Sequence, residues 1–268
     1  MKNSGYIPIY ALRFMVLYFV FINIIAIYLF PGGTLFNPDY TSYSFNENFF
    51  SDLGVTITKD GTQNFLSSFL FNSSLLVLGL AAVSHIFVPK LFKRNTKSYT
   101  LSIIAAVLLM ISGVSFIGVG LTPLDIYFEE HVWFVITAFN AQTVGILFMT
   151  LAFLLSGISK KYTIVAFIYF LNVAFYTYFE TSEPPPDFNP FEVENINDYL
   201  DYNRFIVSVV WQKIIAVIAM ISTFIFTFGY FFLSFVLIFL KESLCILCSI
   251  DELNFLSPLA IFAAPQSL

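Results

Sequence analysis

Six long apolar runs constrain this chain more than any other feature of its sequence. Each is long enough to cross the hydrocarbon core of a bilayer, which is roughly 30 Å thick and needs about 20 helical residues. With 58% hydrophobic and 11% charged residues, the chain departs from soluble domains, in which roughly a quarter of the residues are charged. The sequence therefore predicts an all-α integral membrane bundle of six helices. The predicted spans are residues 12–30, 64–88, 100–121, 132–155, 162–179 and 205–230.

Helix-stopping residues mark the ends of several runs. The first run ends at Pro31-Gly32-Gly33, the second reaches Pro89, and the third stops just before Pro123. The first run carries Lys2 and Arg13 near its start, as a secretory signal does. However, its apolar core is longer than that of such a signal, and no small-residue cleavage site follows it. We therefore expect the first run to remain in the protein as a span.

The apolar character continues beyond the sixth run. Residues 231–268 form an apolar tail that is interrupted by charged residues such as Lys241 and Asp251 and by Pro258. Such a tail can lie as a helix at the membrane surface, which is the expected arrangement, or form a weak seventh span. The predicted organisation is thus a six-span domain over residues 1–230 followed by this tail.

The distribution of charge predicts the orientation in the membrane. If the N-terminus is inside, nine of the twelve Lys and Arg residues fall in the N-terminal segment, the short inner loops and the tail, which follows the positive-inside rule. Most acidic residues then lie outside, so the net charge of −5 belongs to the outer loops and does not indicate nucleic-acid binding. We predict a multi-pass protein of the cell membrane with both termini cytoplasmic and membrane lipids as its partners. The nine residues are Lys2, Arg13, Lys90, Lys93, Arg94, Lys97, Lys160, Lys161 and Lys241.

A cluster of polar and ionisable residues is expected at the outer membrane edge. Asp52 precedes the second span, His131 opens the fourth, and Lys213 lies about two turns into the sixth. A lysine within an apolar helix needs a carboxylate partner or must reach the interface, and Asp52 is the partner that we name first. The functional interpretation makes Asp52, His131 and Lys213 a catalytic set, with Asp52 or His131 as the base and Lys213 stabilising negative charge. The alternative is that these residues only pair structurally.

Polar side chains within or beside the spans are candidate binding residues. Hydrocarbon offers them no hydrogen-bond partner, so they should face the bundle interior. They can bind a ligand there, or they can hold neighbouring helices together, as such residues commonly do. The candidates for binding are Ser51, Asn72, Gln142 and Gln212.

Metal and cofactor chemistry find little support in the sequence. The predicted topology places the two histidines, His85 and His131, on opposite sides of the membrane, so they cannot share a zinc site. No Gly-x-Ser-x-Gly elbow, phosphate-binding Gly-Lys-Ser or Gly-Lys-Thr loop, or dinucleotide fingerprint occurs. We therefore expect neither a metal nor a cofactor.

Several short motifs carry a resemblance to a known family. They are Phe50-Ser51-Asp52-Leu53-Gly54, Phe71-Asn72 with Gly79, the stretch from Gly118 to Pro123, and His131. In these motifs the chain resembles the six-helix prokaryotic membrane proteins of domain-of-unknown-function family 998. That family is similar in layout to the eukaryotic FRAG, DRAM and SFK membrane proteins, some of which are linked to lipid remodelling or autophagy. The resemblance implies a fold and no established activity.

Two classes of function remain open from the sequence. In the first, an outer-leaflet polar pocket binds or processes a lipid headgroup. In the second, the protein is a non-catalytic scaffold or lipid-binding subunit whose polar residues hold the helices together. A transporter fits less well, because Gly and Pro fall at the ends of the spans instead of breaking helices in mid-membrane. The sequence does not decide whether the protein is an enzyme, and it leaves the oligomeric state open.

Overall fold

The structure, a computed structural model, contains six α-helices and three short 3-10 helices in the part of the chain that it describes. This part comprises residues 5–183, 188–193 and 196–256, with side chains up to residue 237. The α-helices are α1 (Ile7–Leu29), α2 (Phe65–Val83), α3 (Thr96–Leu121), α4 (Phe128–Leu155), α5 (Lys160–Thr181) and α6 (Tyr202–Leu256). The 3-10 helices are η1 (Phe50–Gly54), η2 (Ser84–Phe92) and η3 (Ile196–Asp198).

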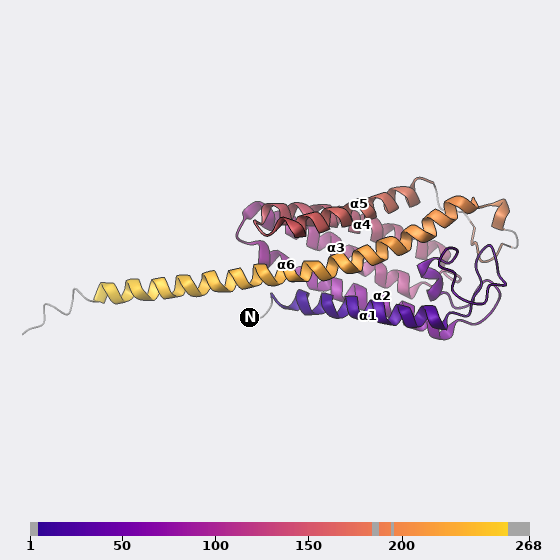
Figure 1. The fold of residues 1–268 in the computed structure, drawn as a ribbon, viewed down its shortest axis with the longest axis horizontal. Helices are drawn as coiled ribbons and strands as arrows, with labels where there is room; N and C mark the ends of the chain where they lie inside the picture. Colours follow the sequence, from indigo (N-terminus) through magenta and orange to yellow (C-terminus); the bar gives the residue numbers. More distant parts are fainter. Residues whose placement is uncertain (1–4, 184–187, 194–195, 257–268) are drawn as a thin grey trace, which may run out of the picture.

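The predicted all-α membrane fold is confirmed. Six helical segments are long and apolar enough to cross a membrane, with α2 and η2 together forming one of them over Phe65–Phe92. The sixth segment covers Tyr202–Leu237, but α6 itself continues without a break to Leu256 and projects beyond the other helices (Figure 1). The start of the predicted tail is thus an extension of α6. Residues 257–268 of the tail, like Lys2 in residues 1–4, lie outside the described residues.

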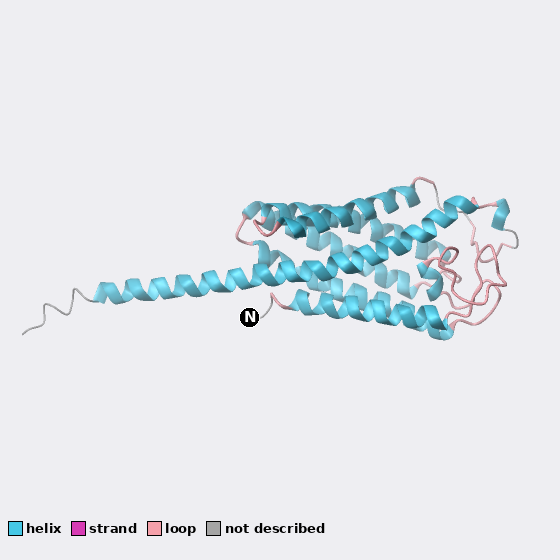
Figure 2. Cartoon of the chain, in the orientation of Figure 1, coloured by secondary structure: helices cyan, strands magenta, loops and turns pink. Residues whose placement is uncertain are grey.

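The six helices form a closed ring. Each helix packs against its neighbours in the chain, and α6 returns to pack against α1 as well as α5. The first long connection, residues 30–64, and the described parts of the second, residues 182–201, lie together at one end of the bundle, which we call the loop end (Figure 2). The start of α1 and the projecting part of α6 lie at the opposite end.

Local sequence signals explain where the helices begin and end. Pro8 sits in the first turn of α1, where its missing N–H costs no hydrogen bond. After α1, Gly32 and Gly33 adopt φ angles of +124° and +78°, which suit glycine and end the run. At the start of α3, the side chain of Asn95 accepts a hydrogen bond from the backbone N–H of Ser98 at 3.1 Å and caps the helix.

Two glycines allow α2 and α3 to approach closely. A Cβ added to Gly79 would lie 2.4 Å from the carbonyl oxygen of Gly113, and a Cβ added to Gly113 would lie 2.2 Å from Cβ of Ala82. Small residues at a helix contact let backbones come together, which is how helices commonly associate in membranes. Gly79 and Gly113 therefore serve the packing of α2 against α3.

The apolar core fills the ring over most of its length. Its largest fully buried side chains include Phe153 of α4, whose ring lies 5.6 Å from that of Phe92, 5.2 Å from that of Phe226 and 5.9 Å from that of Tyr230. This aromatic cluster joins η2, α4 and α6 towards the end opposite the loops. Polar side chains concentrate instead near the loop end, around η1.

Candidate functional site

The short helix η1 is held in place by the first half of α2. Ser68 and Asn72 donate hydrogen bonds to the carbonyl oxygen of Gly54 at 2.8 and 3.1 Å, and Ser67 donates to that of Leu53 at 3.2 Å. A Cβ at position 54 would lie 2.7 Å from Oδ1 of Asn72, so the contact requires glycine. Asn72, a candidate binding residue, thus positions η1 and does not line the two large cavities described below.

On its other side, η1 is bound by α6. Oε1 of Gln212 accepts a hydrogen bond from the backbone N–H of Phe50 at 2.5 Å. The ammonium group of Lys213 donates to the carbonyl oxygens of Asn48, at 2.5 Å, and Val209, at 3.2 Å. Two consecutive residues of α6 therefore tie it to the segment that forms η1.

Asp52 is buried within η1. Its side chain is 3% exposed, and Oδ2 accepts hydrogen bonds from the amide of Asn48 at 3.1 Å and from the backbone N–H of Phe49 at 2.9 Å. Oδ1 is buried without a hydrogen-bond partner in the described structure. Burial raises the pKa of Asp52 to about 6, although the amide of Asn48, the charge of Lys213 and the N–H of Phe49 oppose this rise.

Asp52 and Lys213 are linked through Asn48. Asn48 donates through its side chain to Asp52 and accepts through its carbonyl oxygen from Lys213. The only ion pair within 4.0 Å in the described residues joins Arg204 and Glu183, so Asp52 and Lys213 do not form a direct salt bridge. The two side chains therefore interact electrostatically without direct contact, and Asn48 connects them through its side-chain amide and its backbone carbonyl oxygen.

A large cavity lies next to η1, between the loop-end halves of α4, α5 and α6. We call it the loop-end cavity. Its volume is about 850 Å³. Four of the candidate site residues predicted from the sequence line this cavity. Lys213 does not line it, because its ammonium group lies on the side of η1 that faces the rings of Tyr43 and Phe45, each 5.5 Å away. The candidates in the wall are Ser51, Asp52, His131 and Gln212, which stand beside Glu180, Glu183, Asp201 and Arg204.

His131 occupies the first turn of α4 and is 4% exposed. Its Nδ1 lies 2.6 Å from the carbonyl oxygen of Thr122, which closes the turn between α3 and α4. A carbonyl oxygen can only accept, so Nδ1 carries the hydrogen, and Nε2 of the neutral ring is an acceptor. His131 lines the loop-end cavity, and Nε2 is the ring nitrogen that Thr122 leaves unengaged.

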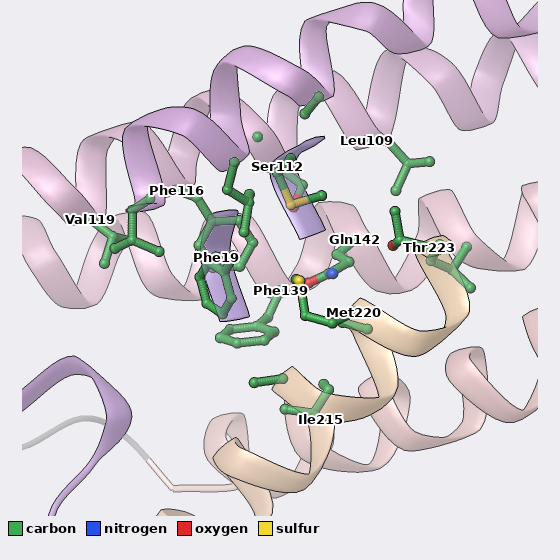
Figure 3. Close-up of a pocket in the computed structure, with 18 of the residues that line it drawn as sticks. Phe19, Leu109, Ser112, Phe116, Val119, Phe139, Gln142, Ile215, Met220 and Thr223 are labelled. Atoms are coloured by element: carbon green, nitrogen blue, oxygen red, sulfur yellow. The ribbon is translucent and has the colours of Figure 1, made fainter. Parts of the chain in front are cut away.

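A second, smaller cavity lies at the centre of the ring. We call it the central cavity. It has a volume of about 150 Å³ and is lined by residues of all six α-helices. Phe19, Phe116, Phe139 and Met220 belong to its largely apolar lining (Figure 3). Gln142, a predicted binding residue, also lines it and donates a hydrogen bond to the hydroxyl of Tyr169; its Oε1 is buried without a partner in the described part of the chain.

The two cavities share part of their walls. Ser51 of η1, Val135 and Phe139 of α4, and Gln212 of α6 line both. The loop-end cavity is rich in carboxylates, whereas the central cavity is surrounded mainly by aliphatic and aromatic side chains. The interior of the ring therefore changes from polar to apolar across this shared wall.

Metal binding has no obvious location in the described residues. No three His, Cys, Asp or Glu side chains lie close enough together there to hold an ion. His85 is in η2, which follows the end of α2, whereas His131 begins α4 at the loop end. The two histidines thus lie far apart along the bundle, as the predicted topology places them.

Sequence reasoning missed three residues that shape the site. Asn48 bridges Asp52 and Lys213, Glu180 accepts a hydrogen bond from Ser208, and Arg204 pairs with Glu183. Asn48 lies four residues before Asp52, but nothing in the spacing of a loop indicates such a contact. Glu180 and Arg204 could have been found as charged residues at the ends of the spans adjoining the second long connection.

Comparison with known proteins identifies one family. The model of the family described as "Protein of unknown function (DUF998)" matches residues 24–191. No curated protein and no solved structure matches the chain. The match runs from the second half of α1 into the second long connection and includes η1, Asp52 and His131. The similarity in layout to the FRAG, DRAM and SFK proteins stays a prediction.

Proposed function

The chain belongs to the DUF998 family, and from this premise we propose that it binds a membrane lipid within the ring of helices. In this proposal, the lipid headgroup occupies the loop-end cavity and part of a hydrocarbon chain enters the central cavity. With the orientation predicted by the positive-inside rule, the headgroup lies at the outer leaflet. The observation that carries the proposal is the shared wall between a polar and an apolar cavity.

The sizes of the cavities are compatible with such a ligand. The loop-end cavity, at about 850 Å³, falls within the range of roughly 300–1,000 Å³ that is common for small-molecule sites. The central cavity, at about 150 Å³, is similar in size to an engineered apolar cavity that stays dry and takes up benzene. It can therefore hold a short length of hydrocarbon, while the larger cavity holds a polar headgroup.

A lateral route for the lipid is suggested by Asn140 in α4. Asn140 is exposed, lines the loop-end cavity, and lies on the same helical face as Trp133 and Val144, which are 61% and 42% exposed. Twelve residues separate Asn140 from Phe128 at the start of α4, which is about 18 Å along the helix. The cavity therefore reaches the lipid-facing surface well below the loop end, where a hydrocarbon chain is available.

The proposal is tested by filling the central cavity. Ala216 of α6 lines this cavity, whereas its neighbour Val217 is 57% exposed on the outside of the ring. We expect the wild-type protein, purified in mild detergent, to retain a bound lipid in native mass spectrometry. The Ala216→Phe variant should bind this lipid at least about tenfold more weakly. The Val217→Phe variant should bind it as the wild type does. A tenfold loss corresponds to about 1.4 kcal/mol of binding free energy.

Two results would overturn the proposal. One is a wild-type protein that retains no lipid and takes up none when lipid is added back. The other is equal retention by the Ala216→Phe and Val217→Phe variants. If Ala216→Phe does not fold, Thr223→Phe serves in its place, because Thr223 lies two helical turns further along the same face and lines the same cavity.

Chemical processing of the bound headgroup is a second candidate function. It is favoured by one observation, which is that Asp52 and His131 both line the loop-end cavity. Lys213, the third member of the predicted catalytic set, is engaged by two backbone carbonyls and does not line this cavity, so its role is to position η1. Separate Asp52→Asn and His131→Gln variants should each change the lipid profile of the host membrane, and an unchanged profile in both would exclude the enzyme.

A further inference from the structure

The charges in the loop-end cavity are strongly one-sided. Its lining contains four carboxylates and a single arginine. Because the headgroup occupies this cavity in the proposed function, the imbalance bears on which headgroups it can accept. The ionisable residues of the lining, apart from tyrosines, are Asp52, His131, Glu180, Glu183, Asp201 and Arg204.

The arginine is already occupied by the protein. Its guanidinium pairs with Glu183 at 3.0 Å, donates to the carbonyl oxygen of Phe179 at 2.7 Å and to the hydroxyl of Ser182 at 3.1 Å, and lies 4.4 Å from the centre of the Phe179 ring. Arg204 is therefore committed to holding the ends of α5 and α6 together. An anionic headgroup would have to break these contacts to gain a cationic partner in the cavity.

The carboxylates, by contrast, include one that has an oxygen without a hydrogen-bond partner among the described residues. Oδ1 of Asp52 is buried without a partner in the described structure, although the side chain is 3% exposed. With a pKa raised by burial to about 6, Asp52 is mainly ionised at pH values above neutrality. His131 lines the same cavity, and its Nδ1 is engaged by the carbonyl oxygen of Thr122. Such a lining can accept hydrogen bonds from a ligand more readily than it can donate them.

Aromatic rings complete the environment. Phe128 and Phe139 of α4, Tyr176 and Phe179 of α5, and Phe205 of α6 all line the cavity. The faces of aromatic rings attract ammonium groups, an interaction worth roughly 0.5–2 kcal/mol, and do not attract anions. Carboxylates and aromatic rings together are therefore suited to a positively charged nitrogen.

We propose that the loop-end cavity selects a lipid whose headgroup carries a positively charged nitrogen, as a primary or quaternary ammonium. This inference rests on the proposed lipid-binding function and specifies the class of ligand. Asp52, in η1 at the inner wall, and Glu180, on α5, supply the charge that pairs with the ammonium group, and the aromatic rings surround its methyl or methylene groups.

The experiment compares headgroups on identical dioleoyl chains. Delipidated protein in detergent is titrated with dioleoyl-trimethylammonium-propane, dioleoyl-phosphatidylethanolamine, dioleoyl-phosphatidylglycerol and dioleoylglycerol, and binding is followed by native mass spectrometry. We expect the two lipids with an ammonium group to bind at least about tenfold more tightly than phosphatidylglycerol. The Asp52→Asn and Glu180→Gln variants should each reduce this preference, whereas Asp39→Asn, which changes an exposed carboxylate outside the cavity, should leave it unchanged.

The possible outcomes separate the two proposals. Equal or tighter binding of phosphatidylglycerol overturns the headgroup assignment and leaves lipid binding standing. A preference that survives in both cavity variants also overturns it. Failure of all four lipids to bind overturns lipid binding itself.

Choline chloride, added as a soluble ammonium source, should bind at least tenfold more weakly than the chain-bearing ammonium lipid. Equally tight choline binding would retain the cation site and overturn the role of the hydrocarbon chain.

Discussion

The ionisation of Asp52 provides a direct test of the environment that the structure assigns to the site. Its carboxylate is buried, and its pKa is raised to about 6, first by burial and against the opposing effects of Asn48, Lys213 and the N–H of Phe49. The Asp52→Asn substitution keeps the size of the side chain and one acceptor oxygen, but it removes the titration. The variant and the wild type should therefore differ in how their stability depends on pH.

The magnitude follows from the difference between a folded pKa of about 6 and the ordinary value of 3.8. At 1.36 kcal/mol per pH unit, this difference amounts to about 3 kcal/mol in the free energy of unfolding. Because the folded pKa is the higher one, the folded protein holds this proton more tightly than the unfolded chain does. The contribution to stability is thus fully present below pH 3.8 and is lost as the pH rises through about 6.

The assay is unfolding in detergent micelles at a series of pH values from about 4 to about 7.5. Across this range, the free energy of unfolding of the wild type should fall by most of this difference, about 2 kcal/mol, relative to that of Asp52→Asn. The other ionisable groups that interact with Asp52 are Lys213 and Tyr43. Burial and the charge of Asp52 raise the pKa of Tyr43 far above the pH range of the assay, so Tyr43 does not titrate within it. An Asp39→Asn control should remain parallel to the wild type. Parallel curves for Asp52→Asn as well would refute the assigned burial of the carboxylate.

Further predictions concern the packing of the ring and the attachment of its loops. Gly79→Ala should lower the free energy of unfolding by roughly 1–3 kcal/mol, because the added Cβ would collide with the backbone of α3. In the same unfolding assay, Gly145→Ala should have a smaller effect, because the nearest neighbours of its Cβ are leucine side chains at 3.1 Å or more. Asp125→Ala removes a carboxylate that accepts hydrogen bonds from the start of the loop after η1, and should increase the rate of tryptic cleavage after Lys59 in purified protein. Lys213→Met leaves a buried loop carbonyl without its donor and should lower the unfolding free energy by about 1–3 kcal/mol.

The spans were predictable because a bilayer requires long apolar helices, and the sequence displays their length directly. The ends were less accurate. The second predicted span, residues 64–88, corresponds to α2 followed by η2, in which Pro89 lies within a 3-10 helix that hydropathy alone does not reveal. The sixth predicted span ends at residue 230 with a helix expected beyond it, and α6 runs on to Leu256 with no proline or glycine after Gly229.

The site was predictable in part. Ser51, Asp52 and His131 attracted attention as polar residues at span ends, and they do line one cavity. What the sequence could not supply was the direction of Lys213, which is decided by the carbonyl oxygen of Asn48 on a loop that crosses to α6. A hydrogen bond between residues 165 positions apart leaves no periodic signal in a single sequence.

The structure also shows why a polar segment can stabilise an apolar bundle at this point. A lysine buried in α6 and an aspartate buried in η1 are each unfavourable alone, since an unpaired charge in a low-dielectric interior loses its hydration. Asn48 contacts both at once, through Oδ2 of Asp52 and the ammonium group of Lys213, while Gln212 of α6 and Asn72 of α2 bind the two ends of η1. The segment thereby joins helices on different sides of the ring, and it also forms the wall that the two cavities share. A change that loosens η1 should therefore alter stability and ligand occupancy together, whereas a change confined to one cavity should alter occupancy alone.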